Sequence, residues 1–79
     1  MSEQWTPIYE WWRHGGWYVT NIRYPSGAVG CVAHDYDRNG KRTGKWRIAC
    51  DEREGDYVYP TRDAAARAER ELVEGMMKA

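Results

Sequence analysis

Polar and apolar positions between residues 8 and 50 fall into short runs rich in β-branched and aromatic residues, separated by turn-forming segments. The turn signals are HGG at 14–16, PSGA at 25–28 and the Asn39-Gly40 dipeptide. Short runs between such signals are typical of antiparallel hairpins. The pattern therefore predicts strands over residues 8–13, 17–24, 29–36 and 45–50.

The Asn39-Gly40 dipeptide favours a two-residue type I′ turn, because both central positions of that turn need positive φ. This turn would gather apolar side chains on one face, pairing Ala33 with Trp46, Cys31 with Ile48 and Val29 with Cys50. A second two-residue turn at Ser26-Gly27 would add Tyr18, Thr20, Ile22 and Tyr24. We expect this face to be the core.

The opposite face of the predicted sheet is mixed aromatic and basic. By alternation it carries Trp17, Val19, Asn21, Arg23, Val32, His34, Tyr36, Lys45 and Arg47. Solvent-facing strands are usually more uniformly polar. Two alternatives stay open: this face is a binding surface, or residues 1–12 fold over it as a lid. The turn at HGG also leaves open whether Trp11 or Trp12 points toward the core.

The C-terminal part of the chain predicts a helix. After a short extended YVY segment at 57–59, which could form a brief fifth strand, Thr61 follows Pro60 as an N-cap, and the helix runs to about Met77. Its apolar stripe is Ala65, Ala68, Leu72 and Met76. The predicted fold is α+β: one domain over residues 1–79, with a four-stranded antiparallel meander covered on one face by the helix. Residues 1–6 are a candidate tail.

Composition indicates the kind of protein and the cellular compartment to expect. The chain has 79 residues, 42% of them hydrophobic and 30% charged, and no apolar run approaches the roughly 20 residues of a membrane span. The start, MSEQWTP, does not resemble a signal peptide. We therefore expect a cytoplasmic protein without a membrane partner. In that compartment Cys31 and Cys50 would be buried, reduced thiols.

Aromatic and charged residues point to a binding surface. The chain has five Trp, six Tyr and no Phe, and Trp and Tyr are enriched where proteins bind partners. The formal net charge is zero, yet DRNGKRTGKWR at 37–47 carries five basic side chains, and DEREGD at 51–56 carries four acidic ones. The predicted partner-binding residues are Trp17, Arg23, Tyr36, Arg38, Lys41, Arg42, Lys45 and Arg47.

Other chemistries fit the sequence poorly. GKRTGK has three residues between its glycines where a phosphate-binding loop needs four, and Trp46 follows Lys45 where that loop needs Ser or Thr. Cys31 and His34 would point to opposite faces of a strand, so with Cys50 they make a poor metal site. No catalytic arrangement of side chains stands out. We expect a non-enzymatic protein with neither cofactor nor metal.

Two resemblances bear on function. GGWYV at 15–19 and YPTRDAAARAERELV at 59–73 resemble the arm-type DNA-binding domain of phage integrases. That resemblance implies a sheet that enters the DNA major groove. The neutral total charge and the acidic DEREGD segment depart from it, because DNA-binding domains are usually basic.

In size, expected fold, Trp/Tyr content and segregated charges, the whole chain is similar to small phage-encoded anti-CRISPR proteins that inhibit type I surveillance complexes, type I-C among them. This second resemblance is the leading hypothesis. It implies a monomeric, non-enzymatic inhibitor in the bacterial cytoplasm. Such an inhibitor docks on a host nucleoprotein complex and blocks or misdirects nucleic-acid binding, while binding nucleic acid only weakly by itself.

Overall fold

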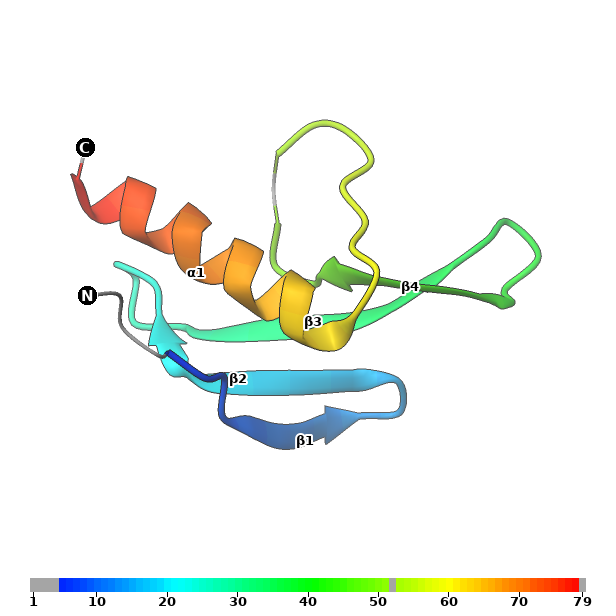
Figure 1. The fold of residues 1–79 in the computed structure, drawn as a ribbon, viewed down its shortest axis with the longest axis horizontal. Coiled ribbons are helices and arrows are strands. Elements are labelled where there is room, and N and C mark those ends of the chain that lie inside the picture. Colours follow the sequence, from blue (N-terminus) through cyan, green and yellow to red (C-terminus); the bar gives the residue numbers. More distant parts are fainter. Residues whose placement is uncertain (1–4, 52, 79) are drawn as a thin grey trace.

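The computed structural model describes residues 5–51 and 53–78, which form one four-stranded antiparallel sheet and one helix (Figure 1). The strands β1 (Tyr9–Arg13), β2 (Gly16–Arg23), β3 (Val29–Tyr36) and β4 (Arg42–Ile48) lie side by side in chain order, and α1 (Arg62–Lys78) packs on one face. The predicted α+β meander with a C-terminal helix is confirmed. The possible fifth strand is reduced to one bridge between Trp46 and Tyr59.

The N-terminal tail expected over residues 1–6 is partly packed. Residues 1–4 lie outside the described part of the chain. Trp5 is half-buried against the core, and Thr6 O accepts a hydrogen bond from Asn21 Nδ2 at 2.9 Å. Residues 5 and 6 of the candidate tail therefore contact the body of the protein.

Helix α1 begins as its cap predicts, because Thr61 Oγ1 accepts from Ala64 N at 3.0 Å. Its buried stripe differs from the predicted one and consists of Ala65, Ala66, Glu69 and Val73, while Met76 is 45% exposed. The two stripes share Ala65, and the predicted stripe did not include Glu69. Glu69 instead lies at the centre of the buried stripe.

The β3–β4 hairpin closes through a three-residue loop, and the predicted type I′ turn is wrong. Gly40 N donates to Asp37 O at 3.0 Å, and Asp37 N donates to Lys41 O at 2.8 Å. Gly40 has a φ of 81°, whereas Asn39 does not adopt a positive φ. This is a type I turn followed by a left-handed glycine. Asp37 favours it because its Oδ1 accepts from the N–H groups of Asn39 and Lys41.

The β2–β3 hairpin has the same kind of loop. Tyr24 N donates to Ala28 O and Gly27 N donates to Tyr24 O, both at 2.8 Å, and Gly27 has a φ of 98°. Pro25 occupies the second position of the turn, which its fixed φ favours. The two-residue turn predicted at Ser26-Gly27 is therefore also wrong, because a type I turn followed by a left-handed glycine closes this hairpin as well.

The longer loops change which residues share a face of the sheet. Val32 lies opposite Ile48 and His34 opposite Trp46, each one residue from the predicted pairing, and Val29 lies opposite Arg23. A slip of one residue moves a side chain to the other face. Trp46 and Ile48 therefore join Val32 on the face that α1 covers. Ile22 reaches the same face as Val19 because the register of β2 shifts between Val19 and Arg23.

The face expected to be open is thus the buried one. Val19 and Val32 are fully buried and pack with Ala65, Ala66 and Val73 of α1, and Trp17 and Trp46 lie against this cluster. The face away from the helix carries Tyr18, Cys31, Ala33 and Arg47, as their strand pairings place them together.

Neither Trp11 nor Trp12 enters the core. Trp11 is 63% exposed, and Trp12 lies on the face away from the helix with its ring 5.6 Å from that of Tyr18. The alternative of a lid concerned the face of Trp17, Val19 and Val32. Trp5 and Tyr9 do pack against the core on that face, alongside α1, whereas Trp12 lies on the other face.

Cys31 and Cys50 form a disulfide, with their Cα atoms 6.3 Å apart, so the expectation of reduced thiols is wrong. The register explains the pairing. β4 ends at Ile48, Ala49 N donates to Cys31 O at 2.9 Å, and the chain then turns so that Cys50 reaches Cys31. A disulfide is typical of oxidising compartments, so the cysteines no longer support the cytoplasmic expectation. Within the described residues, no helix is long and apolar enough to cross a membrane.

Candidate functional site

A two-stranded ribbon projects from the body of the protein. The last pair that joins β2 to β3 is Gly16 with Ala33, and beyond it β3 and β4 continue as a hairpin to the loop at residues 38–40. Figure 1 shows this hairpin reaching past both α1 and the β1–β2 hairpin. We call residues 36–45 the ribbon tip.

The ribbon tip concentrates positive charge. It holds four exposed cations, Arg38, Lys41, Arg42 and Lys45, and one carboxylate, Asp37. That carboxylate is turned inward, because its Oδ1 accepts from two backbone N–H groups of the loop. Among the described residues, none of the four cations forms an ion pair. The tip thus presents an excess of three positive charges in a chain whose net charge is zero.

Tyr36 lies at the base of the ribbon tip, with its hydroxyl close to Gly15 of the β1–β2 turn. It is 43% exposed and lies opposite Arg42 in the β3–β4 pair. His34 lies just behind it, with its ring centroid 3.8 Å from that of Trp46. Burial lowers the pKa of His34, as do the positive charges of Arg42 and His14. His34 therefore adds little positive charge at neutral pH.

Arg47 was predicted to bind a partner, but the structure gives it an internal role. Its Nε donates to Asp35 and its Nη2 donates to Asp56, which ties β4 to the acidic segment that follows. Hydrogen bonds from Arg47 and then Thr43 hold the pKa of Asp35 below its usual range. Because Arg47 is paired with both Asp35 and Asp56, it does not contribute to the unpaired positive charge of the ribbon tip.

Two further predicted residues lie away from the ribbon tip. Trp17 is half-buried against the core, with the guanidinium carbon of Arg62 5.2 Å from its ring centroid. Arg23 lies at the opposite end of the sheet, where its Nη1 donates to Gly27 O at 3.0 Å. Of the eight predicted residues, the structure gathers Tyr36, Arg38, Lys41, Arg42 and Lys45 and separates Trp17, Arg23 and Arg47.

The face away from the helix is a weaker candidate. A hollow of about 640 Å³ crosses it near the ribbon base, lined in part by Arg13, Ala33, Arg47 and Asp51. Arg47 is paired with Asp35, and Glu10, opposite Tyr18, adds a negative charge to the same face. This face therefore lacks the excess positive charge that the ribbon tip has.

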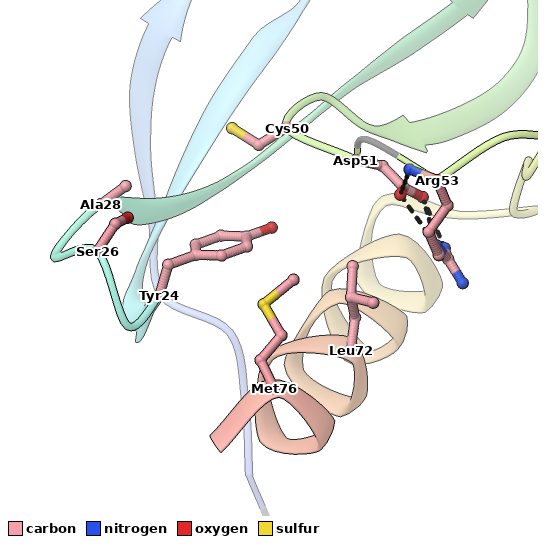
Figure 2. A pocket seen from close by; sticks show the side chains of 8 residues that line it. All are labelled: Tyr24, Ser26, Ala28, Cys50, Asp51, Arg53, Leu72 and Met76. Carbon is pink, nitrogen blue, oxygen red and sulfur yellow. Dashed lines mark hydrogen bonds and ion pairs between the residues drawn. The ribbon is translucent and has the colours of Figure 1, made fainter. Parts of the chain in front are cut away.

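A second hollow, of about 420 Å³, lies between α1, the β2–β3 loop and the segment after β4 (Figure 2). Tyr24, Leu72 and Met76 form apolar walls, Cys50 contributes its sulfur, and an ion pair between Arg53 and Asp51 at 2.6 Å stands at the rim. The polar groups at this rim already bind each other, so the hollow has little to recognise a ligand.

Glu69 is the residue that sequence reasoning missed. It is fully buried, and its Oε2 accepts from the Tyr24 hydroxyl at 2.5 Å and from Cys31 N at 3.2 Å, while Oε1 has no partner. Burial raises the pKa of Glu69. One signal was present in the sequence: Glu69 falls four residues from both Ala65 and Val73 on the helix.

Neither metal chemistry nor relatives define the site. Within residues 5–51 and 53–78, no group of three or more His, Cys, Asp or Glu side chains is placed to hold a metal ion. The chain matches no protein-family model, no curated protein and no solved structure. The ribbon tip is the candidate site on its geometry and charge alone.

Proposed function

We propose that this protein is a non-enzymatic interaction module that docks through its ribbon tip on a host nucleoprotein complex and blocks or misdirects nucleic-acid binding. The observation that carries the proposal is the cluster of Arg38, Lys41, Arg42 and Lys45 on a projecting hairpin in a chain of zero net charge. Charges at an exposed rim steer association, and Tyr36 can supply contact area.

A type I CRISPR surveillance complex, and specifically type I-C, is the partner that we propose. The resemblance to small phage-encoded inhibitors supports this choice, and the compact fold with one projecting charged element suits a protein that obstructs a larger assembly. In this setting the protein acts as a monomer in the bacterial cytoplasm, although the Cys31–Cys50 disulfide is more typical of oxidising compartments.

The alternative is a DNA-binding domain of the arm type, which would place the face of a sheet in the major groove. That use of the sheet fits the charges less well, because Glu10 and the Asp35–Arg47 pair lie on the face away from the helix. The other face is covered by α1. A DNA-binding role would therefore also rely on the ribbon tip.

The test is binding of target DNA by a reconstituted type I-C complex in the presence of increasing amounts of the protein. Wild-type protein should reduce target binding. The double variant Lys41→Gln/Arg42→Gln should weaken inhibition about tenfold or more, whereas Arg23→Gln/Lys78→Gln, which removes the same charge elsewhere, should change it less than about twofold. If wild-type protein leaves target binding unchanged, the proposed function is wrong.

A further inference from the structure

We infer that the ribbon tip binds the phosphate backbone of B-form duplex DNA by entering its major groove, without reading base sequence. This inference rests on the proposed function, since it names the chemistry that the ribbon tip would meet in the host nucleoprotein complex.

The dimensions of the ribbon suit a groove. Past the end of β2, only β3 and β4 continue, and neighbouring strands lie about 4.8 Å apart. The major groove of B-form DNA is about 12 Å wide and admits a two-stranded ribbon. The corresponding groove of A-form RNA is deep and narrow, so side chains on such a ribbon could not reach into it. The shape therefore favours duplex DNA over duplex RNA.

The cations are placed where they can contact the phosphates that border the groove. Arg38 is in the loop and Lys41 follows it, while Arg42 and Lys45 lie at the start of β4, which is the outer strand of the sheet. They therefore run from the end of the ribbon along one flank. The carboxylate of the tip, Asp37, accepts hydrogen bonds from the loop backbone, and Asp35, just before the tip, accepts from Arg47 and Thr43.

Charge elsewhere on the molecule determines which surface of the protein can approach DNA. The segment after β4 carries Asp51, Glu54 and Asp56, and α1 exposes Glu71 and Glu74. On α1 these acids are balanced by Arg62, Arg67, Arg70 and Lys78, so the segment after β4 is the part that would repel a phosphate backbone. The ribbon tip, with its excess positive charge, is the end that can approach DNA. The same repulsion keeps binding weak, in the micromolar to submillimolar range typical of non-specific contacts.

The test is fluorescence anisotropy with a labelled duplex DNA, a duplex RNA of the same sequence and a polyglutamate peptide, each measured over a range of salt. Wild-type protein should bind the DNA most tightly. The logarithm of its affinity should fall against the logarithm of salt with a slope of about −3.6, from about −0.9 per phosphate-bound cation. Changing the DNA sequence should alter the affinity less than about threefold, because phosphate contacts carry no sequence information.

The matched variants separate charge from position. Lys41→Gln/Arg42→Gln should flatten the slope by about 1.8, while Arg23→Gln/Lys78→Gln should leave it unchanged. Tighter binding to polyglutamate than to DNA, or equal binding to DNA and RNA, would overturn the inference. If the ribbon variant loses inhibition of the surveillance complex but wild-type protein ignores DNA, only this inference fails. If DNA binding follows the expected slope but the complex is not inhibited, only the proposed function fails.

Discussion

Glu69 takes the place of a missing strand residue. β4 ends at Ile48, opposite Val32, so the next outward-facing N–H of β3, that of Cys31, has no strand partner and donates to Glu69 instead. Buried backbone donors need such partners. This arrangement leaves Glu69 as a buried carboxylate whose Oε1 has no hydrogen-bond partner. One charged side chain thus completes the sheet where the chain turns away from it.

The raised pKa of Glu69 makes stability depend on pH. A carboxyl whose pKa is higher in the folded state stabilises the fold fully below its unfolded pKa, and this contribution is lost as pH rises through the folded pKa. The difference in free energy of unfolding between wild type and Glu69→Gln should therefore decrease from about pH 4 toward neutral pH. Urea unfolding followed by Trp fluorescence measures it.

The other titrating groups cancel in that difference, and a second variant checks the assignment. Tyr24→Phe removes a hydrogen bond that lowers the pKa of Glu69, so it should extend the pH dependence to higher pH. A wild-type minus Glu69→Gln difference that is constant with pH would contradict the role of Glu69.

Gly30 leaves the space that Glu69 occupies. A Cβ at Gly30 would lie 2.7 Å from Glu69 Oε1 and 2.9 Å from Ile22 Cβ. Gly30→Ala should therefore destabilise the protein by about 1–3 kcal/mol through overpacking, measured by chemical denaturation. Gly75→Ala is the control, because a Cβ there meets nothing within 4 Å, and it should be neutral or stabilising by up to about 1 kcal/mol. Equal losses for the two variants would refute the packing argument.

At the scale of elements, the sequence predicted the hairpins and the helix but not the register. Gly27 and Gly40 mark both turns, yet the residues before them decide whether the loop has two or three residues. Asp37 and Pro25 favour a type I turn, and the signal of Asn39-Gly40 for a type I′ turn competed with them. Because a slip of one residue exchanges faces, a small error in turn length assigned Trp17 to a binding surface.

The exposed cations of the ribbon tip could be predicted from the sequence because exposure near a hairpin loop does not depend on strand register. The face on which a side chain lies does depend on it. Arg38, Lys41 and Arg42 are exposed in any hairpin that closes near Asn39, whatever its register. Arg47 required more information, because its pairing with Asp56 joins segments nine residues apart across a turn that sequence patterns do not describe. Local charge was readable, and tertiary ion pairs were not.

The disulfide is the main covalent constraint on the segment after β4. It links residues 19 apart, and closing a loop of this size stabilises a protein by about 3 kcal/mol in the chain-entropy model. Reduction with dithiothreitol should therefore lower the free energy of unfolding by about that amount. The variant Cys31→Ala/Cys50→Ala should show no response to the reductant. A wild-type protein equally indifferent to the reductant would show that the bond adds no stability.

At the scale of the whole molecule, zero net charge hides a strong polarity. The ribbon tip is basic at one end of a molecule whose longest extent is 40 Å, while the segment after β4 is acidic and the exposed charges of α1 are mixed. At an ionic strength of 0.1 M, charges screen over about 10 Å, so a surface approaching the tip meets its cations and little of the distant acids. Local charge, rather than the total, should then govern what the protein binds.

This polarity predicts behaviour on a cation exchanger that total charge does not. With a sequence isoelectric point of about 6.7, the protein should pass through a sulfonate resin at neutral pH if only net charge mattered. We expect retention at low salt, because the ribbon tip can face the resin alone. Arg38→Gln/Lys41→Gln/Arg42→Gln should abolish retention, whereas Arg23→Gln/Arg67→Gln/Lys78→Gln, with the same net charge, should still bind. Equal elution of the two triple variants would mean that the positions of the cations do not affect retention. That result would contradict the assignment of the ribbon tip as the binding site.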